Sequence, residues 1–168
     1  IPKKLFNLNK DREYLLITMG GSDEKNETLN ILISIKEQIL NIPTFVIAGP
    51  SHPDIQSLNL YCSKFLPNAK VINSPKSLIP YIKKSYLAIS AGGVTTYELL
   101  AGKVFTGIFI IEEHQKVLAR SLISMNLSML IGSYENNSFS SIKKNFKKMI
   151  NKDKKKSRNN FKIFNSSG

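Results

Sequence analysis

Apolar residues in this chain fall into short continuous runs, many of them β-branched, separated by stretches in which apolar residues recur at helical spacing. Such uninterrupted runs are typical of strands that are buried on both faces of a sheet. Strands are predicted over 14–18, 44–48, near 70–72, and over 86–90, 104–110 and 128–131. Helices are predicted over 29–40, in a short stretch after residue 53, and over 77–84, 95–101, 115–125 and 139–150. Because strands alternate with helices throughout, we expect an α/β fold with a doubly wound, Rossmann-like parallel sheet of about six strands.

Two glycine-rich turns each follow a predicted strand and open a predicted helix. Gly20-Gly21-Ser22-Asp23 comes after the first strand, and Ala91-Gly92-Gly93-Val94-Thr95-Thr96 comes after the fourth. Glycine lets an anion approach the backbone closely, and the unpaired N–H groups of the following helix point at it. In the common strand order 3-2-1-4-5-6, the first and fourth strands are neighbours where the winding direction reverses, and ligands bind there. The sequence therefore predicts one crevice in which both turns and both helix N-termini face a diphosphate.

Side chains beside the second turn refine this prediction. Thr95 and Thr96 can add hydroxyl donors, whereas Glu98 would place a carboxylate beside an anion and is better suited to a sugar diol. The alternative is that both turns are only tight connections and that Glu98 favours its own helix N-terminus. The sequence has no Gly-x-x-x-x-Gly-Lys-Ser/Thr loop, and the first turn lacks Gly-x-Gly-x-x-Gly spacing. ATPase and dehydrogenase functions therefore lose support.

Composition sets the class of the protein. The 168 residues are 42% apolar and 21% charged, which suits one globular domain. The longest apolar stretch, around 107–111, is far shorter than the ~20 residues of a membrane span, so we expect a soluble protein, and the use of a single cysteine fits a reducing, cytoplasmic setting. Cys62 is the only cysteine and there are two histidines, which excludes an internal disulfide and a zinc-type cluster. No metal or cofactor is predicted, and Cys62 is expected to be buried without a chemical role.

The formal charge of +12 is concentrated at the end of the chain. Residues 143–168 carry a net +9, and residues 1–142 carry a net +3. We therefore expect a ligand-binding domain over 1–151 and a basic, flexible tail over 152–168. Such a tail can also bind nucleic acid, but no strand interleaves aromatic and basic residues as base stacking would require. Nucleic acid is accordingly an unfavoured partner.

Several of these motifs together resemble a known family. They are Met19-Gly20-Gly21-Ser22-Asp23 with Asn26 and Thr28, Gly49-Pro50, Gly92-Gly93-Val94-Thr95-Thr96-Tyr97-Glu98 and Glu113-His114-Gln115. They are similar to the C-terminal domain of the UDP-sugar hydrolase of pseudaminic acid biosynthesis, and to spore coat polysaccharide proteins. The resemblance spans about Leu15 to Gly132 and extends more distantly to GT-B glycosyltransferases. It implies the C-terminal half of a GT-B fold.

The resemblance also implies roles for particular residues. Gly92, Gly93, Thr95 and Thr96 would hold the pyrophosphate, Glu98 would hold the ribose hydroxyls, and backbone near Ile72 would meet uracil. Gly20, Gly21, Ser22 and Asp23 would lie on the phosphate or sugar side of the cleft. Glu113, His114 and Gln115 would lie near the sugar. His114 stands where relatives usually carry Asn, so either a ligand contact or an ordinary surface histidine remains open for it. No residue of this chain is expected to be catalytic.

The implied function is that of a UDP-sugar-binding domain. In the hydrolase family the catalytic histidine belongs to an N-terminal domain, and no equivalent segment occurs in these 168 residues, which begin at Ile1. We therefore expect the intact protein to cleave a UDP-linked diacetamido-trideoxyhexose with the help of a missing N-terminal domain, and this piece to bind UDP without turnover. The alternatives are the donor-binding domain of a GT-B glycosyltransferase and, less favoured, a non-catalytic module that binds nucleic acid through the tail.

Overall fold

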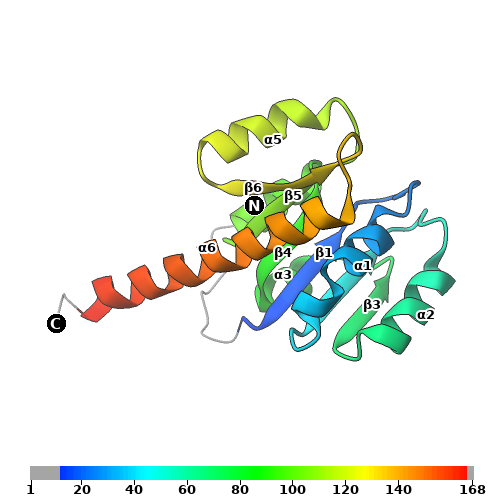
Figure 1. Cartoon of the computed structure of the whole chain (residues 1–168), viewed down its shortest axis with the longest axis horizontal. Coiled ribbons are helices and arrows are strands. Elements are labelled where there is room, and N and C mark those ends of the chain that lie inside the picture. Colours follow the sequence, from blue (N-terminus) through cyan, green and yellow to red (C-terminus); the bar gives the residue numbers. More distant parts are fainter. Residues whose placement is uncertain (1–11, 166–168) are drawn as a thin grey trace.

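The computed structural model describes residues 12–165, with side chains through Asp153. Its six strands form one parallel sheet in the order β3-β2-β1-β4-β5-β6 (Figure 1). The strands are β1 (Tyr14–Thr18), β2 (Thr44–Ala48), β3 (Ala69–Asn73), β4 (Ser85–Ala91), β5 (Phe105–Ile110) and β6 (Ser128–Ser133). The helices are α1 (Glu27–Ile39), α2 (Ile55–Phe65), α3 (Ile79–Lys84), α4 (Val94–Ala101), α5 (Gln115–Ser124) and α6 (Phe139–Asn165). The predicted doubly wound sheet and its strand order are confirmed.

Helices cover both faces of the sheet, as the continuously apolar strands require. Leu15 and Ile17 of β1 point to one face and pack in a core shared with α1, α2 and α6. Leu16, between them, points to the other face and packs with Ile82 of α3 and Leu99 of α4. This alternation within one strand explains why β1 has no polar side: both of its faces are buried.

The last helix begins on the body of the domain and continues past it (Figure 1). Ile142, Phe146 and Met149 are fully buried and give α6 an apolar stripe against the sheet and α1. Gly107 of β5 is required here, because a Cβ at this position would overlap the side chain of Ile131 and come within 2.9 Å of Met149 Sδ. The helical stripe was predicted to end near residue 150, but the helix itself runs to Asn165. The prediction that residues 152–168 are flexible stays a prediction.

No helix within residues 12–165 is both long enough and apolar enough to cross a membrane.

Cys62 is 2% exposed, and burial raises the pKa of its thiol to about 11. The expectation that Cys62 is buried is therefore confirmed.

Candidate functional site

A hollow at the carboxyl ends of the strands is lined by the turn after β1 and by the first turn of α4. The hollow has a volume of about 190 Å³. Gly20 and Gly21 line it from the turn after β1, and Thr95 lines it from the first turn of α4. The rest of its wall comes from Thr18 at the end of β1, from the ends of β2 and β3 and the turns that follow them, and from the start of α3, namely Ile47, Gly49, Pro50, Ser74, Pro75 and Leu78. The segments that follow β1 and β4, some seventy residues apart, thus meet at the β1/β4 switch point as predicted, but Gly92 and Gly93, which were expected to hold the pyrophosphate, do not line the hollow.

Backbone packing fixes the shape of the first turn. Gly20 has φ +87°, a conformation that glycine adopts without strain. Gly49, at the end of β2, lies directly against this turn, because a Cβ there would overlap the carbonyl oxygens of Gly20 and Gly21. Ser51 then donates its N–H to the carbonyl of Gly21 at 3.0 Å. The turns after β1 and β2 therefore form one continuous wall.

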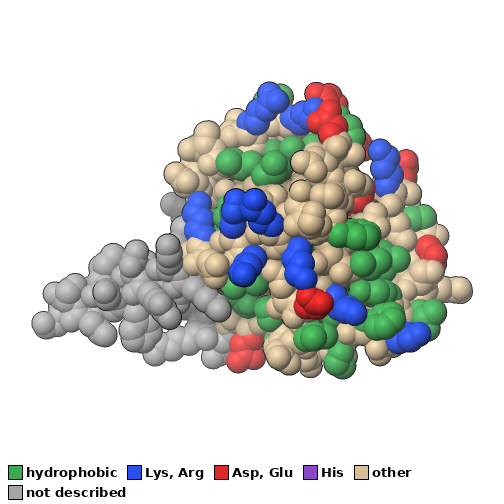
Figure 2. Space-filling model, in the orientation of Figure 1, with side chains coloured by type: hydrophobic (Ala, Val, Ile, Leu, Met, Phe, Trp, Pro, Cys, Tyr) green, Lys and Arg blue, Asp and Glu red, His purple; other side chains and the backbone are tan. Residues whose placement is uncertain are grey.

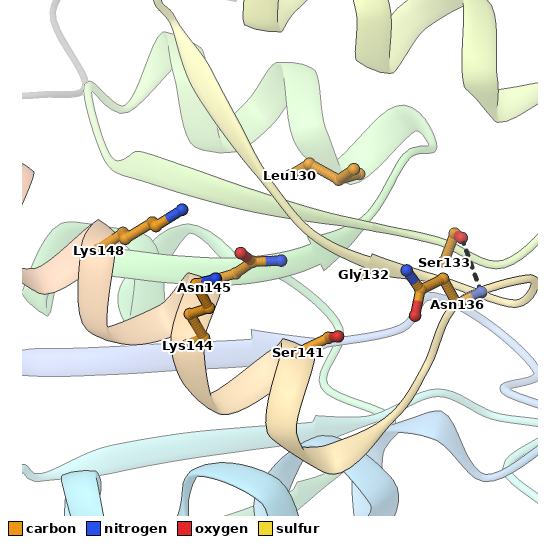
Figure 3. A pocket seen from close by; sticks show the side chains of 8 residues that line it. All are labelled: Leu130, Gly132, Ser133, Asn136, Ser141, Lys144, Asn145 and Lys148. Atoms are coloured by element: carbon orange, nitrogen blue, oxygen red, sulfur yellow. Dashed lines mark hydrogen bonds between the residues drawn. The ribbon is translucent and has the colours of Figure 1, made fainter.

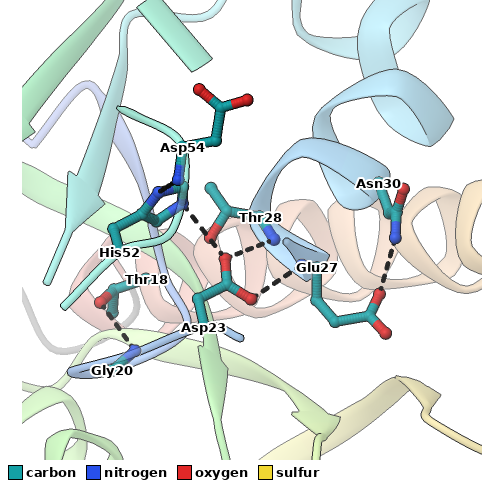
Figure 4. A network of polar contacts seen from close by, with 8 residues as sticks. All are labelled: Thr18, Gly20, Asp23, Glu27, Thr28, Asn30, His52 and Asp54. Carbon is teal, nitrogen blue, oxygen red and sulfur yellow. Dashed lines mark hydrogen bonds and ion pairs between the residues drawn. The ribbon is translucent and has the colours of Figure 1, made fainter. Parts of the chain in front are cut away.

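The N-terminus of α1 is occupied by a carboxylate of the chain itself (Figure 4). Asp23 Oδ1 accepts the N–H of Glu27 at 2.7 Å, and Oδ2 accepts the N–H of Thr28 at 3.0 Å. The side chain of Asp23 is only 3% exposed. The prediction that α1 offers free N–H groups to an anion is therefore wrong: Asp23 already fills that place as a helix cap.

A buried histidine from the turn after β2 lies beside this cap. His52 Nδ1 accepts the N–H of Asp54 at 3.2 Å, so the proton of the neutral ring lies on Nε2. Nε2 faces Asp23 Oδ2 at 3.5 Å, and the imidazole is also 3% exposed. His52 therefore joins the turn after β2 to the cap of α1, a structural role that the sequence analysis did not assign.

The N-terminus of α4, by contrast, is open. Within the described part of the chain, the N–H groups of Val94 and Thr95 have no acceptor, as expected for the first turn of a helix. A Cβ at Gly93 would meet nothing within 4 Å, so the approach to these groups is clear. The site can therefore accept an anion at one helix N-terminus, that of α4.

Two side chains near α4 differ from expectation. Thr96 is fully buried and donates its hydroxyl to the carbonyl of Ala91 at 2.8 Å, so the hydroxyl donor that we expected from it is already used. Glu98 lies three residues after Thr95, on the same side of α4, and its carboxylate makes no hydrogen bond or ion pair within the described residues. Thr95 lines the first hollow, whereas Glu98 is not among its lining residues.

A second hollow, of about 150 Å³, lies on the other side of the first turn. Ser22, Asp23, Glu24 and Lys25 line one wall, with Glu27 behind them, and Ile111 and Glu112 of the β5–α5 loop line the opposite wall. Ser22 and Asp23 therefore face this second hollow, whereas Gly20 and Gly21 face the first. The turn separates two neighbouring compartments of the crevice.

The residues predicted for the sugar side lie at the start of α5. Gln115 is buried and accepts the N–H of Ile111 at 3.0 Å, and its Cβ lies against Gly92, where an added Cβ would come to 3.0 Å. His114 is 74% exposed, with Nδ1 at 3.0 Å from Glu112. The structure therefore brings Gln115 beside the second glycine turn and leaves His114 on the surface.

An ion-pair cluster joins the segment at the start of α5 to the loop after β6. Lys116 Nζ lies 2.7 Å from Glu113 and 3.0 Å from Glu135, and Tyr134 donates its hydroxyl to Glu113. The hydrogen bond from Lys116 lowers the pKa of Glu113, and the hydrogen bond to Glu113 raises the pKa of Tyr134. Glu113 is thus tied to the loop after β6.

The end of β3 contributes differently from expectation. Ile72 does not line the first hollow and packs with the core around Leu16 and Phe45 instead. Its neighbours Ser74 and Pro75, with Leu78, form that wall. These residues could have been found from the sequence, because a Ser-Pro pair directly after a predicted strand lies at the edge where the glycine turns lie.

Comparisons with known proteins agree with the fold. No protein-family model matches the chain. The chain is 24% identical over 129 residues to the spore coat polysaccharide biosynthesis protein SpsG of Bacillus subtilis (strain 168), a match that covers 76% of this chain and 38% of that protein. The expected resemblance to a spore coat polysaccharide protein is thereby found.

Solved structures give the same picture. Acinetobacter baumannii MurG superposes with a TM-score of 0.63 at 14% identity, over 84% of this chain and 42% of MurG. A putative UDP-N-acetylglucosamine 2-epimerase from Listeria monocytogenes superposes with a TM-score of 0.60 at 15% identity, over 89% of this chain and 42% of that chain. The chain therefore has the α/β Rossmann-like fold of these proteins and spans about two-fifths of the length of each protein that it matches.

Proposed function

We propose that this chain is the nucleotide-sugar-binding domain of a larger enzyme and that its ligand is a UDP-sugar. The observation that carries the proposal is the hollow that Gly20, Gly21 and Thr95 share at the switch point of the sheet. A mononucleotide diphosphate suits this place because glycine backbone on one side and an open helix N-terminus on the other both favour a closely approaching anion.

The proposed ligand lies across the first hollow. Its diphosphate is bound at the N–H groups of Val94 and Thr95, over Gly93. Glu98, whose carboxylate is free, accepts hydrogen bonds from the ribose hydroxyls. The base lies between the ends of β2 and β3, where Ile47, Pro75 and Leu78 supply apolar surface and Ser74 supplies polar groups. This arrangement keeps Glu98 on the ribose and away from the phosphates.

The sugar extends toward the second hollow and the start of α5. Ser22 and Glu112 line that hollow, and carboxylates there can accept hydrogen bonds from sugar hydroxyl or amide groups. Asp23 does not take part directly, because both of its oxygens already cap α1. Its role in the site is to hold the turn that divides the two hollows.

The relatives support a role in polysaccharide biosynthesis. SpsG is named for spore coat polysaccharide biosynthesis, and the Listeria protein is named for an epimerase of UDP-N-acetylglucosamine. Within the proposal, the whole protein is a UDP-sugar hydrolase of the pseudaminic acid type that works with a further domain. Transfer of the sugar to an acceptor, as in GT-B glycosyltransferases, is the alternative chemistry for the same binding domain.

Calorimetric titration of the chain with UDP tests the proposal. The Gly93→Ala variant is expected to fold normally, because its φ of −110° suits alanine and the added Cβ meets no atom of the chain. The methyl group would stand where the diphosphate approaches, so UDP affinity should fall about tenfold or more, which corresponds to about 1.4 kcal/mol. Glu98→Ala should weaken UDP binding as well, through loss of the ribose hydrogen bonds.

Matched controls distinguish UDP binding at this hollow from binding elsewhere on the chain. Tyr97→Ala alters an exposed side chain of the same helix and should leave UDP affinity unchanged. Single-stranded DNA, titrated before and after removal of residues 152–168, tests the basic end of the chain as a nucleic-acid site. If Gly93→Ala and Glu98→Ala both bound UDP as tightly as the parent, or if only DNA bound, the assignment would be wrong.

A further inference from the structure

A hollow of about 250 Å³ lies between the edge strand β6 and the first turns of α6 (Figure 3). Ser141, Lys144, Asn145 and Lys148 line it from the helix, and their spacing places them on one stripe of α6. Ser133 and Asn136 line it from the end of β6 and the loop that follows. It shares no lining residue with the two hollows over the glycine turns. Nothing in the proposed function uses it.

Hydrogen-bond donors around this hollow are free to serve a ligand. Ser133 Oγ accepts the N–H of Asn136 at 3.2 Å, and Ser141 Oγ accepts the hydroxyl of Ser138 at 2.8 Å. Because both oxygens act as acceptors, each hydroxyl proton remains available. Asn145 uses one Nδ2 proton on the carbonyl of Ile131 at 3.0 Å, which leaves the second.

Charge in the hollow is uncompensated. No carboxylate lines it, and the acidic residues nearby are paired elsewhere: Glu37 with Lys143, and Glu135 with Lys116. Among the residues whose side chains are described, Lys144 and Lys148 make no ion pair. Figure 2 shows basic side chains gathered over this face, where α6 crosses the sheet. The two ammonium groups therefore create a local positive potential toward the hollow.

We propose that this hollow binds a phosphate group, either as inorganic phosphate or as the phosphomonoester end of a small molecule. A phosphate presents several strong acceptor oxygens, which matches the two ammonium groups, two serine hydroxyls and two asparagine amides that line the hollow from the helix and from the end of β6. The volume of the hollow accommodates such an anion, and the absence of a lining carboxylate removes the repulsion that would exclude it. The site is separate from the proposed diphosphate site at α4.

Titration of the isotope-labelled 168-residue chain with inorganic phosphate, followed by amide NMR shifts, tests this proposal. Total ionic strength is held constant by replacing chloride, so that general screening does not change. Saturable shifts are expected at residues 133–136 and 141–148, apart from any at 92–96. Lys148→Gln should weaken the binding about tenfold, and Asn136→Ala should weaken it severalfold without changing the charge.

Lys147→Gln is the matched control. Lys147 is exposed on the same helix and carries the same charge but does not line the hollow, so its variant should bind phosphate like the parent. Equal losses in Lys147→Gln and Lys148→Gln would show diffuse attraction to a basic helix and overturn the proposal, as would the absence of saturable shifts at 133–148. A parallel titration with glycerol 3-phosphate identifies the source: tighter binding than inorganic phosphate points to a phosphomonoester.

Discussion

Replacement of Asp23 by alanine separates the structural role of this residue from a role in ligand binding. The substitution removes the acceptors of two buried N–H groups, those of Glu27 at 2.7 Å and Thr28 at 3.0 Å. It also leaves His52 Nε2 facing no carboxylate in a site where the imidazole is 3% exposed. The change therefore acts on α1 and on the turn after β2 together.

The magnitude follows from these contacts. A buried donor left without its acceptor costs about 1–3 kcal/mol, so two of them predict a loss of about 3 kcal/mol once partial hydration of the helix end is allowed for. For a chain of this size, a urea m-value of about 2 kcal/mol/M converts this loss into a midpoint about 1.5 M lower. The m-value itself should not change, because the unfolded surface is the same.

Urea unfolding followed by circular dichroism at 222 nm measures this effect. Glu24→Ala is the matched control, since it removes the neighbouring carboxylate of the same turn, which is exposed and lines the hollow without capping a helix. The control should unfold within about 0.5 kcal/mol of the parent. If Asp23→Ala were as stable as Glu24→Ala, the carboxylate would not be a cap, and Asp23 would return to the set of ligand-binding candidates.

Three further predictions concern packing and titration. Gly49→Ala should destabilise the chain by about 1–3 kcal/mol, because its Cβ would overlap the carbonyl oxygens of Gly20 and Gly21. Thermal unfolding measures this loss of stability, and an unchanged melting temperature would contradict the close approach of the two turns. Phe146→Ala should cost about 3–5 kcal/mol by urea unfolding, since the ring is fully buried between α6 and the sheet; a loss below about 1 kcal/mol would mean that α6 does not pack there. Cys62 should resist iodoacetamide at pH 8 and react in urea, because folding raises its pKa to about 11; rapid alkylation of the folded chain would refute its burial. The same shift favours the folded state below the ordinary thiol pKa of 9.0, and this contribution should be lost as the pH rises from there to about 11.

The fold was predictable because its signals are local. Every strand except β3 contains a continuous apolar run of three or more residues, and these runs end near a glycine, a proline or a polar turn, so element order and sheet type follow from the sequence alone. The position at which α6 ends was not predictable from the sequence, because lysine and arginine favour a helix without producing an apolar stripe. Among the residues whose side chains are described, Met149 is the last fully buried one of α6, and the lysine-rich sequence that follows it has no clear apolar period to detect.

The site was predictable only in part, for a related reason. Two glycine turns and the switch point gave its location, because both depend on strand order. The cap by Asp23 involves a left-handed Asn26 at φ 55°, and the histidine beside it, His52, comes from a turn about thirty residues away. These are consequences of tertiary packing. They turned a residue expected to bind ligand into one that supports the wall of the site.

Close approach of the turns after β1 and β2 has a consequence for motion. Because Gly49 seats its backbone against Gly20 and Gly21, and Ser51 holds the Gly21 carbonyl, neither segment can swing outward without the other. Amide hydrogen exchange at Ser51 should therefore slow in step with exchange at residues 27–28 when a nucleotide binds. The wall formed by the turns after β1 and β2 would therefore move as one rigid unit, and the ligand would enter the crevice from the side of α4.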